Sequence, residues 1–594
     1  MCPPYSASDS SGHAAWASTG IQDSGRIFAK RSSERARTSP LAATALLHRA
    51  DFGGRPTTPS GLVGDLGSHL SISCGTTTVG EYAAGMLGPT VAEAARRFGD
   101  QTAYVVRRPG GDWADALHVS YRDLDRISDE VAAALGRRGV GFGDRVGLVF
   151  APGVEYVIAY LALAKLGAVT AGVNDRLSAS ERQAVLAQLD PILVLTHPGC
   201  EPHNFAAETI DRATSVETLF EAVREVGATV PGIVLDADAD AAIIFTSGTT
   251  GQPKGARYSN RQLQFITKTD VGETWGTGGR NFTGTSFAHL GFMTKLPGNL
   301  RRGGTSFIVE RWRPDDALQL LSTQRMTMVA GVPTQFAMML NDPHFDGFDL
   351  SSVQYIITGG GPITVGLAQE CRQRFDAKLQ TRYSCTEAGI GLGTAFDDPL
   401  LDAVVSIGRP HPGVSLAIRD NTDPQRPDDV AIGDIGEVCL RSDACMRGYW
   451  NDPQATAAAF TSDGFVRTGD LGYIDDAGRV RLVGRSKEMY VRGGYNVYPV
   501  EVECILSEHP SVASVVVVPR NDAVMGEIGV ACVVVRDGAE PPTLEALRSL
   551  LIDRVARYKA PEALALVTSF PLTAMDKIDR AALRQKVTDS ATPR

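Results

Sequence analysis

Apolar runs of strand length alternate with helical runs through most of this chain, and this alternation restricts the fold more than any other feature. Residues 143–150, GDRVGLVF, form a buried strand-like run, and residues 153–167, GVEYVIAYLALAKLG, are typical of a helix. Further strand-like runs follow at 168–174, 241–248, 305–310, 326–333 and 353–360. Strands that alternate with helices predict parallel sheets with right-handed crossovers. The expected fold class is therefore α/β.

The beginning of the chain departs from this pattern. Residues 1–77 are rich in Ser, Thr, Gly, Ala and Arg and lack sustained hydrophobic periodicity. Such a segment cannot bury enough apolar surface to fold alone, so it predicts a disordered extension, unless the start codon is assigned too far upstream. Order is expected from about Thr78, and Ser120 is placed to cap an amphipathic helix through 122–135.

The end of the chain also differs. Beyond Gly484, strands are expected at 514–520 and 529–535 and a helix at 543–558, which together indicate a small α+β unit. We therefore expect three parts: an extension at 1–77, a large N-terminal domain at 78–484 and a small C-terminal domain at 485–594.

Composition excludes several classes of protein. The chain of 594 residues has 43% hydrophobic and 21% charged residues, and no apolar run approaches the length of a membrane helix. Its net charge of −10 and the lack of a long basic run predict neither a nucleic-acid partner nor an anionic membrane surface. The nine cysteines are scattered without a Cys-x-x-Cys pair, and the first residues lack a secretory signal. A cytoplasmic location, without a disulfide framework or zinc site, is expected.

The segment 246–256, TSGTTGQPKGA, directly follows an apolar strand-like run and is the most informative part of the sequence. Its amides and hydroxyl groups, with the ammonium of Lys254, can surround phosphate oxygens. It is not the Gly-Lys-Ser/Thr P-loop, because Lys254 follows Pro253, and alone a Ser/Thr/Gly-rich loop is often only a linker. The candidate phosphate ligands are Thr246, Ser247, Gly248, Thr249, Thr250, Gly251 and Lys254.

This segment resembles the ATP-phosphate loop of the adenylate-forming superfamily, which includes acyl-CoA synthetases, peptide-synthetase adenylation domains and firefly-type luciferases. The resemblance continues in order from about residue 78 to about residue 585. It implies a large N-terminal domain of stacked, mainly parallel sheets with helices, followed by a small mobile C-terminal α+β domain. It also implies ATP, Mg²⁺ and coenzyme A as cofactors, and an active site between the two domains.

The segment YSCTEAG at 383–389 resembles the family's Tyr-Gly-x-Thr-Glu motif. The match implies that Tyr383 stacks on adenine, Thr386 contacts phosphate and Glu387 binds Mg²⁺. A carboxylate beside a triphosphate is repulsive unless a cation bridges the two, which gives Glu387 a physical reason to be there.

Further nucleotide ligands follow from two other matches. They are Gly360, Gly361 and Pro362 in the motif GGGP, which resembles the family's adenine-binding turn, and Asp470 and Arg485 in the motifs RTGD and VGR, on the ribose side. A carboxylate can accept hydrogen bonds from both ribose hydroxyls, while a guanidinium supplies donors from the other side.

The C-terminal motifs of the resemblance concern catalysis and movement. Lys487 matches the family's hinge residue, and Gly493 and Gly494 match the loop that lets the pantetheine arm approach. The segment PLTAMDKIDRAALR places the catalytic lysine at Lys577, where an ammonium offsets the negative charge that concentrates as the acid attacks phosphate. Asp576 stands where the family usually has glycine, and two alternatives follow: its charge slows adenylation selectively, or the side chains of Asp576 and Lys577 point apart and the substitution is silent.

The acyl pocket is described by fewer residues. The segment 286–293, SFAHLGFM, occupies the family's pocket and gate region, with His289 as a candidate gate or as a hydrogen-bonded core histidine. Ser384 and Cys385 are further candidate pocket residues, and Ser384 adds bulk where the family usually has glycine. Amino-acid-activating relatives usually carry an aspartate in this segment, so its absence predicts an acid without an α-ammonium group.

The expected activity is ATP-dependent ligation of a small-molecule carboxylic acid to coenzyme A through an acyl-AMP intermediate. Two alternatives keep the chemistry but change its use: an enzyme that loads a carrier protein in trans, and a variant specialised for the thioester-forming half-reaction. A catalytically inert nucleotide-binding scaffold and a luciferase-like oxygenase are the remaining alternatives, and the first is disfavoured by the joint presence of Lys254, Glu387, Asp470, Arg485 and Lys577.

Overall fold

The computed structural model describes residues 86–107, 111–231, 236–246, 253–420, 428–573 and 577–589. All of them belong to one compact unit, Gly80–Arg594. The expected extension at 1–77 and the onset of order at Thr78 lie outside the described residues. No helix among the described residues is long and apolar enough to cross a membrane.

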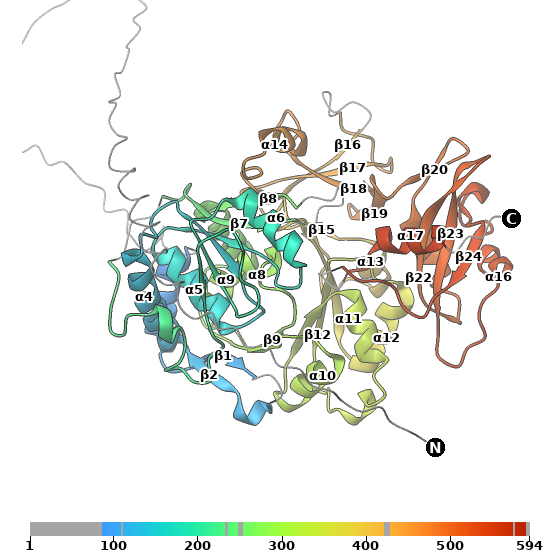
Figure 1. Ribbon diagram of the computed structural model, residues 1–594. Coiled ribbons are helices and arrows are strands. Elements are labelled where there is room, and N and C mark those ends of the chain that lie inside the picture. Colours follow the sequence, from blue (N-terminus) through green and yellow to red (C-terminus); the bar gives the residue numbers. More distant parts are fainter. Residues whose placement is uncertain are drawn as a thin grey trace, which may run out of the picture. The chain divides into compact units, whose positions relative to one another are not determined.

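The largest sheet has six strands and carries the predicted phosphate loop (Figure 1). Its order is β6 (Ala207–Thr209), β5 (Leu193–Thr196), β3 (Arg145–Val149), β4 (Val169–Gly172), β7 (Asp240–Phe245) and β8 (Gly255–Ser259). All neighbours are parallel except β7 and β8, which form an antiparallel pair. The parallel sheet that the alternating pattern predicts is therefore confirmed.

The helices described beside this sheet are α3 (Leu87–Phe98), α4 (Tyr121–Arg137), α5 (Val154–Lys165) and α6 (Ala179–Leu189). The sequence predicts two of them, α4 and α5. The predicted cap of α4 is present, because the Ser120 hydroxyl accepts from the backbone N–H of Asp123 at 3.0 Å. In α5, every residue from Val154 to Leu163 is buried, as an apolar run without a polar face requires.

Two further sheets of the large domain are mixed, and each contains three consecutive parallel strands with antiparallel neighbours at one side. One has the order β2 (Leu117–Ser120), β1 (Thr102–Val106), β10 (Thr305–Ile308) and β9 (Arg280–Thr283). The other has the order β11 (Met328–Gly331), β12 (Tyr355–Gly359), β13 (Lys378–Tyr383), β14 (Leu392–Gly393) and β15 (Arg409–Pro410). The helices of this region are α7 (Asn260–Val271), α8 (Leu290–Met293), α9 (Leu296–Arg302), α10 (Pro314–Thr323), α11 (Pro333–Leu340), α12 (Val365–Phe375) and α13 (Leu400–Val405).

A fourth sheet was not foreseen among the parallel ones. Its strands β16 (Ser415–Arg419), β17 (Gly436–Arg441), β18 (Val466–Ile474) and β19 (Val480–Arg485) are antiparallel throughout. The short helix α14 (Pro453–Ala459) lies between β17 and β18 in the chain. Only five residues join β18 to β19, which allows a hairpin but no parallel crossover.

The C-terminal part has the expected α+β composition. Its elements are β20 (Tyr490–Arg492), β21 (Tyr495–Val497), α15 (Pro499–Leu506), β22 (Val512–Asp522), β23 (Gly526–Val535), α16 (Leu544–Ser549), β24 (Ala563–Leu566) and α17 (Arg580–Asp589). The single helix predicted at 543–558 is wrong, because α16 ends at Ser549 and a separate short 3₁₀ helix follows at Arg557–Lys559. Asp553 has a φ of 62°, a left-handed conformation that interrupts the helical path.

A buried ion pair joins the last helix to the rest of the small domain. The two terminal nitrogens of Arg580 donate to the two carboxylate oxygens of Glu503, each at 2.7 Å. Glu503 also accepts from the backbone N–H of Val517 at 2.7 Å. The Nε of Arg580 lies 3.2 Å from a carboxylate oxygen of Glu488, which follows the predicted hinge. Three segments of the small domain thus meet at one guanidinium.

Candidate functional site

The predicted phosphate loop joins β7 to β8 at the carboxyl edge of the six-stranded sheet. At its base, the backbone N–H of Thr246 donates to the carbonyl oxygen of Lys254 at 2.9 Å. The Nζ of Lys254 lies 5.2 Å from the centre of the Tyr449 ring, in cation–π geometry. Ser247, Gly248, Thr249, Thr250 and Gly251 lie outside the described residues.

Glu387 lies beside the same tyrosine. The Tyr449 hydroxyl donates to Oε1 of Glu387 at 2.7 Å, and burial, aided by the charge of Glu387, raises the pKa of Tyr449. The neighbouring backbone is fixed as well, because the Tyr258 hydroxyl donates to the carbonyl oxygen of Thr386 at 2.6 Å. Tyr449 therefore joins the predicted phosphate-binding lysine to the predicted metal-binding carboxylate. No sequence signal had distinguished it from a core tyrosine.

The two predicted ribose-side residues face each other. Asp470 on β18 and Arg485 on β19 are register partners, and Nε of Arg485 donates to Oδ1 of Asp470 at 2.9 Å. The Tyr383 hydroxyl donates to the other oxygen of Asp470 at 2.6 Å. The charge of Asp470 is the main reason that the pKa of Arg485 is raised. Each carboxylate oxygen can accept a second hydrogen bond, so Asp470 can still receive a ligand's hydroxyl groups.

The predicted adenine turn follows β12, and Gly360, Gly361 and Pro362 are all exposed. Gly360 has a φ of 77°, a conformation that favours glycine. A Cβ added to Gly359 would lie 2.5 Å from the carbonyl oxygen of Arg382, so no side chain fits there. The turn therefore presents bare backbone, against which a flat ring can lie.

Lys577 reaches this turn. Its Cε lies 3.8 Å from the position that a Gly360 Cβ would take. Burial, and then the charge of Arg485, lowers the pKa of Lys577, whereas the charge of Asp470 acts in the opposite direction. The predicted catalytic lysine, adenine turn and ribose-side pair thus lie close together. Asp576, the departure from the family pattern, lies outside the described residues.

His289 lies at the start of α8, and its Nε2 is buried without a hydrogen-bond partner among the described residues. Burial, followed by the charge of Lys577, lowers the pKa of His289 to about 4. The side chain is therefore neutral at physiological pH and influenced by the predicted catalytic lysine. Among the described residues, its Nε2 lacks the hydrogen bond that is expected of a histidine in the core.

Aromatic side chains lie beside His289. The rings of Phe287 and Phe292 stack with centroids 3.7 Å apart, and the Tyr156 ring stands perpendicular to both. Of the other predicted pocket residues, Ser384 is exposed, and burial raises the pKa of Cys385.

We expect His289 to make the folded state less stable at mildly acidic pH. Its pKa is about 4 in the folded protein and about 6.5 when unfolded, so only the unfolded chain binds this proton between those values. Stability is present above about pH 6.5 and falls as the pH drops towards about 4, by up to about 3 kcal/mol. Urea unfolding at about pH 7 and about pH 5 measures this loss. The loss should be smaller in His289→Gln, and an equal loss in both proteins would contradict the assignment.

The predicted hinge and pantetheine loop lie away from these contacts. Lys487 is exposed two residues after β19 ends, and Ser486 is held by a 3.0 Å hydrogen bond from its N–H to the carbonyl oxygen of Gly469. Gly493 and Gly494 form the exposed turn between β20 and β21, with φ of 54° and 87°. No other described atom comes within 4 Å of a Cβ placed on Gly494, beyond its chain neighbours.

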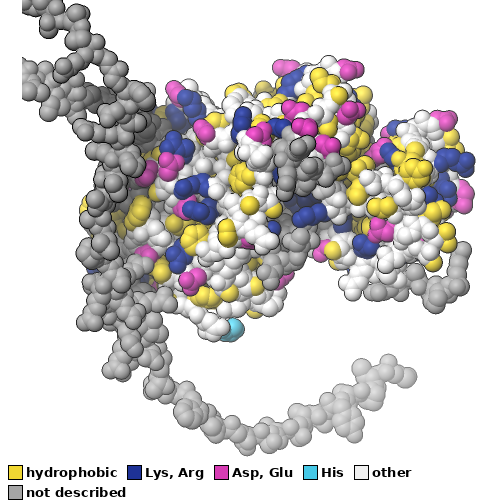
Figure 2. Space-filling model, turned by 90° about the horizontal axis from the view of Figure 1, so that it is seen from above, with side chains coloured by type: hydrophobic (Ala, Val, Ile, Leu, Met, Phe, Trp, Pro, Cys, Tyr) yellow, Lys and Arg dark blue, Asp and Glu magenta, His cyan; other side chains and the backbone are white. Residues whose placement is uncertain are grey.

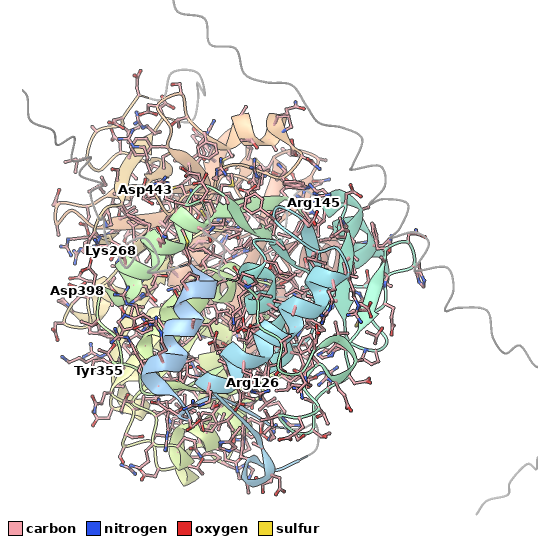
Figure 3. The ribbon with its side chains drawn as sticks, turned by 90° about the vertical axis from the view of Figure 1, so that its left-hand side faces the viewer. Arg126, Arg145, Lys268, Tyr355, Asp398 and Asp443 are labelled. Atoms are coloured by element: carbon pink, nitrogen blue, oxygen red, sulfur yellow. The ribbon has the colours of Figure 1, made fainter. Side chains whose placement is uncertain are left out.

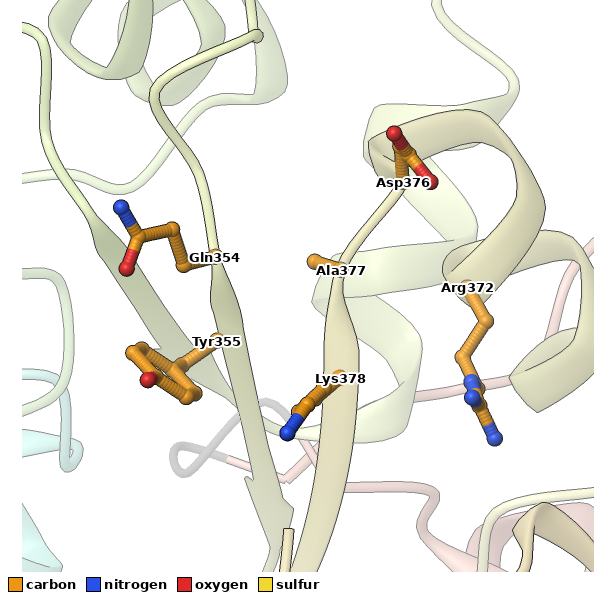
Figure 4. Close-up of a pocket in the computed structure, with 6 residues that line it drawn as sticks. All are labelled: Gln354, Tyr355, Arg372, Asp376, Ala377 and Lys378. Atoms are coloured by element: carbon orange, nitrogen blue, oxygen red, sulfur yellow. The ribbon is translucent and has the colours of Figure 1, made fainter. Parts of the chain in front are cut away.

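A surface hollow of about 390 Å³ lies at the amino ends of β12 and β13, away from the carboxyl ends that carry the Gly360 turn and Tyr383 (Figure 4). Its lining residues are Gln354, Tyr355, Arg372, Asp376, Ala377 and Lys378. In Figure 4, Tyr355 and Lys378 lie at the amino ends of the two strands and Arg372 comes from α12, whereas Gly359 and Tyr383 lie at the carboxyl ends of the strands. Ligands of parallel sheets bind at carboxyl ends, so we do not assign this hollow to the reaction.

The fold and the residues gathered at these strand ends define an adenylate-forming enzyme, and comparisons with known proteins agree. A family model described as AMP-binding enzyme matches residues 91–450, and its C-terminal domain model matches residues 501–577. The chain belongs to this family of AMP-binding enzymes, which confirms the resemblance found in the motifs.

The names of individual relatives state different acceptors for the activated acid. The indoleacetate–CoA ligase of Aromatoleum aromaticum is 32% identical, over 79% of this chain and 93% of its own length. The fatty acid–[acyl-carrier-protein] ligase ScoC of Streptomyces coeruleorubidus is 30% identical, over 79% of this chain and 91% of its own. The structure of ATP-bound MatB from Rhodopseudomonas palustris matches with a TM-score of 0.73 and 27% identity, covering 84% of this chain and 99% of that one.

Proposed function

We propose that this protein is an AMP-forming acid–thiol ligase that couples a carboxylic acid to coenzyme A through an acyl-AMP intermediate. The observation that carries the proposal is the position of Lys577, against the Gly360 turn and under the influence of Asp470 and Arg485. An ammonium in that place would lie beside the α-phosphate of a nucleotide whose adenine rests on the turn and whose ribose binds Asp470.

In the first half-reaction, a carboxylate oxygen of the acid attacks the α-phosphorus of ATP, and pyrophosphate leaves. Lys254 and the loop after β7 would hold the outgoing phosphates, and Lys577 would offset the charge that accumulates at the α-phosphate. Asp470, held by Arg485 and Tyr383, would fix the ribose and so the direction of attack.

Glu387 is the residue proposed to hold Mg²⁺. Its carboxylate is a suitable hard ligand, and the Tyr449 hydroxyl fixes one of its oxygens in place. No cluster of three or more His, Cys, Asp or Glu side chains in the described ranges could hold a metal by itself. We propose that phosphate oxygens and water would supply further ligands of an ion at Glu387, which would neutralise part of the phosphate charge.

In the second half-reaction, the thiol sulfur of coenzyme A attacks the acyl carbon, and AMP leaves with the bonding electrons. We propose that the small domain turns at Lys487, withdraws Lys577 and brings the Gly493–Gly494 turn to the site for the pantetheine arm. Rotation of a single domain would then serve both reactions. The acceptor could instead be a carrier protein acting in trans, which the name of the Streptomyces relative favours.

A two-acceptor assay tests the proposed function. The protein is incubated with MgATP, a panel of carboxylic acids without α-amino groups, and either coenzyme A or a phosphopantetheinylated carrier protein. We expect acid-dependent release of AMP and an acyl-CoA product, both measured by mass spectrometry. Thioester on the carrier alone would move the assignment to carrier loading. If no acid gives AMP with either acceptor, the proposed function is wrong.

A further inference from the structure

A cluster of three cations surrounds one carboxylate in the large domain, and one of the cations, Arg382, directly precedes Tyr383 in the chain. Asp270, at the end of α7, lies 3.3 Å from Nζ of Lys295, and its other oxygen lies 3.0 Å from a terminal nitrogen of Arg302. A terminal nitrogen of Arg382 also donates to Asp270, at 2.9 Å. The Asp270 side chain is only 4% exposed, and the three cations strongly lower its pKa.

The cluster has more positive than negative charge. Within the described part of the chain, Asp270 is the one carboxylate paired with Lys295, Arg302 or Arg382, so two positive charges remain unbalanced. His411 adds no charge at neutral pH, because burial, followed by the charges of Arg382 and Lys295, lowers its pKa. A structural ion pair needs only one cation, and each additional one increases like-charge repulsion.

The three cations are not sealed in the core. Lys295, Arg302 and Arg382 retain side-chain exposures of 30%, 36% and 31%. Burial nevertheless is the largest cause of the lowered pKa of Lys295. A half-buried cation of this kind is less screened by water than one at the surface, so it would attract the charge of a ligand more strongly.

The cluster is also linked through the chain to predicted site residues. Arg382 directly precedes Tyr383 on β13, so their side chains point to opposite faces, and Tyr383 uses its own face to reach Asp470. Lys295 directly precedes α9, six residues after His289 in the same segment of chain. Arg382 and Lys295 thus belong to the two segments that carry the predicted adenine-side tyrosine and the candidate gate histidine.

We infer that the acid activated by this protein carries a second anionic group, most simply as a dicarboxylic acid, whose distal carboxylate binds Lys295 and Arg382. This inference rests on the proposed function. The proximal carboxylate would lie between His289 and Lys577, and the distal one would offset one of the two excess positive charges, with the planar guanidinium of Arg382 able to bind both of its oxygens. Asp270 would hold the cations in position, and its negative charge would repel any anion beyond the distal carboxylate.

The test compares straight-chain dicarboxylic acids of increasing length with monocarboxylic acids of the same length. Acid-dependent pyrophosphate release gives kcat/KM for each pair. For wild-type protein we expect the best diacid to exceed its matched monoacid by about tenfold or more. Lys295→Met, which keeps the shape and removes the charge, should lower this ratio by about tenfold, mainly through the KM of the diacid.

The matched control is Lys268→Met. Lys268 lies on the same helix as Asp270, but its side chain is 72% exposed (labelled in Figure 3). The diacid-to-monoacid ratio of this variant should equal that of wild type. Two results would overturn the inference: a wild-type preference for monoacids, or a Lys295→Met variant whose activity falls equally with both acids, as a purely structural role would cause. Turnover of monoacids alone would leave the proposed function intact, whereas no turnover with any acid would remove both.

Discussion

Lys577→Ala is expected to reduce ATP–pyrophosphate exchange by about 10²–10³-fold while leaving most of the thioester-forming activity from preformed acyl-AMP. The physical reason is the position of the ammonium against the Gly360 turn and near Asp470 and Arg485, where the α-phosphate of a bound nucleotide would lie. Exchange of labelled pyrophosphate into ATP measures the first half-reaction, and a single-turnover assay with synthetic acyl-AMP and coenzyme A measures the second.

The comparison between half-reactions separates a catalytic role from a structural one. Loss of folding would lower both rates together, and the exposed Lys268→Ala provides a matched charge deletion. Wild-type protein in the same two assays also tests the alternative suggested by Asp576. Slow exchange together with fast thioester formation would support specialisation for the second half-reaction, and fast exchange would exclude it. Unchanged exchange in Lys577→Ala would remove this lysine from the mechanism.

Glu387→Gln should reduce acid-dependent pyrophosphate release by about 100-fold or more, because the proposed Mg²⁺ loses its anionic ligand. The amide keeps the size of the carboxyl group and can still accept the hydrogen bond from Tyr449, so the fold should be retained. Raising the Mg²⁺ concentration should recover part of the activity in the variant and none in wild type at saturation. Activity equal to that of wild type at low Mg²⁺ would contradict the assignment.

Tyr449→Phe is the control for this position. It removes the hydrogen bond to Glu387 but keeps the ring that lies under Lys254. We expect a weaker apparent affinity for Mg²⁺ with a smaller loss of maximal rate than in Glu387→Gln, as is usual when a group orients a ligand without being one. A loss equal to that of Glu387→Gln would mean that the tyrosine itself contacts the nucleotide.

Much of the large domain could be predicted because its signals are local. Continuous apolar runs mark β3 and β4 as buried strands, and the Ser120 cap fixes the start of α4. The proposed nucleotide ligands each lie in a short motif with its own order of residue types, so they could be proposed from the sequence, and their roles stay predictions. Local signals therefore indicated both the class of fold and the residues at the ends of its strands.

Other features depend on contacts between distant segments and have no local signature. Tyr449 lies 62 residues from Glu387, and Arg382 lies 112 residues from Asp270, so neither pair could be found from the spacing of residues. The antiparallel sheet that ends at Arg485 was likewise hidden, because an apolar run does not specify the direction of its neighbour. The helix predicted at 543–558 was too long, because the apolar pattern did not reveal the left-handed residue Asp553.

The charged side chains on the face of the molecule in Figure 2 do not indicate a binding site in the way that the short motifs do. Figure 2 shows Lys and Arg side chains interspersed with Asp and Glu over the described residues, without one large patch of either sign. The specificity for an anionic substrate that we infer would instead come from the three cations around Asp270.

The guanidinium of Arg580 has a consequence for the movement of the small domain. It binds Glu503 in the body of that domain and Glu488 directly after the hinge, and it lies only three residues beyond Lys577. The ion pairs of Arg580 thus connect the predicted hinge segment, the body of the small domain and the segment that carries Lys577. If the small domain rotates at Lys487, as proposed above, these ion pairs would make the segment of Lys577 move with the domain, so that withdrawal of Lys577 and arrival of the thiol would be coupled.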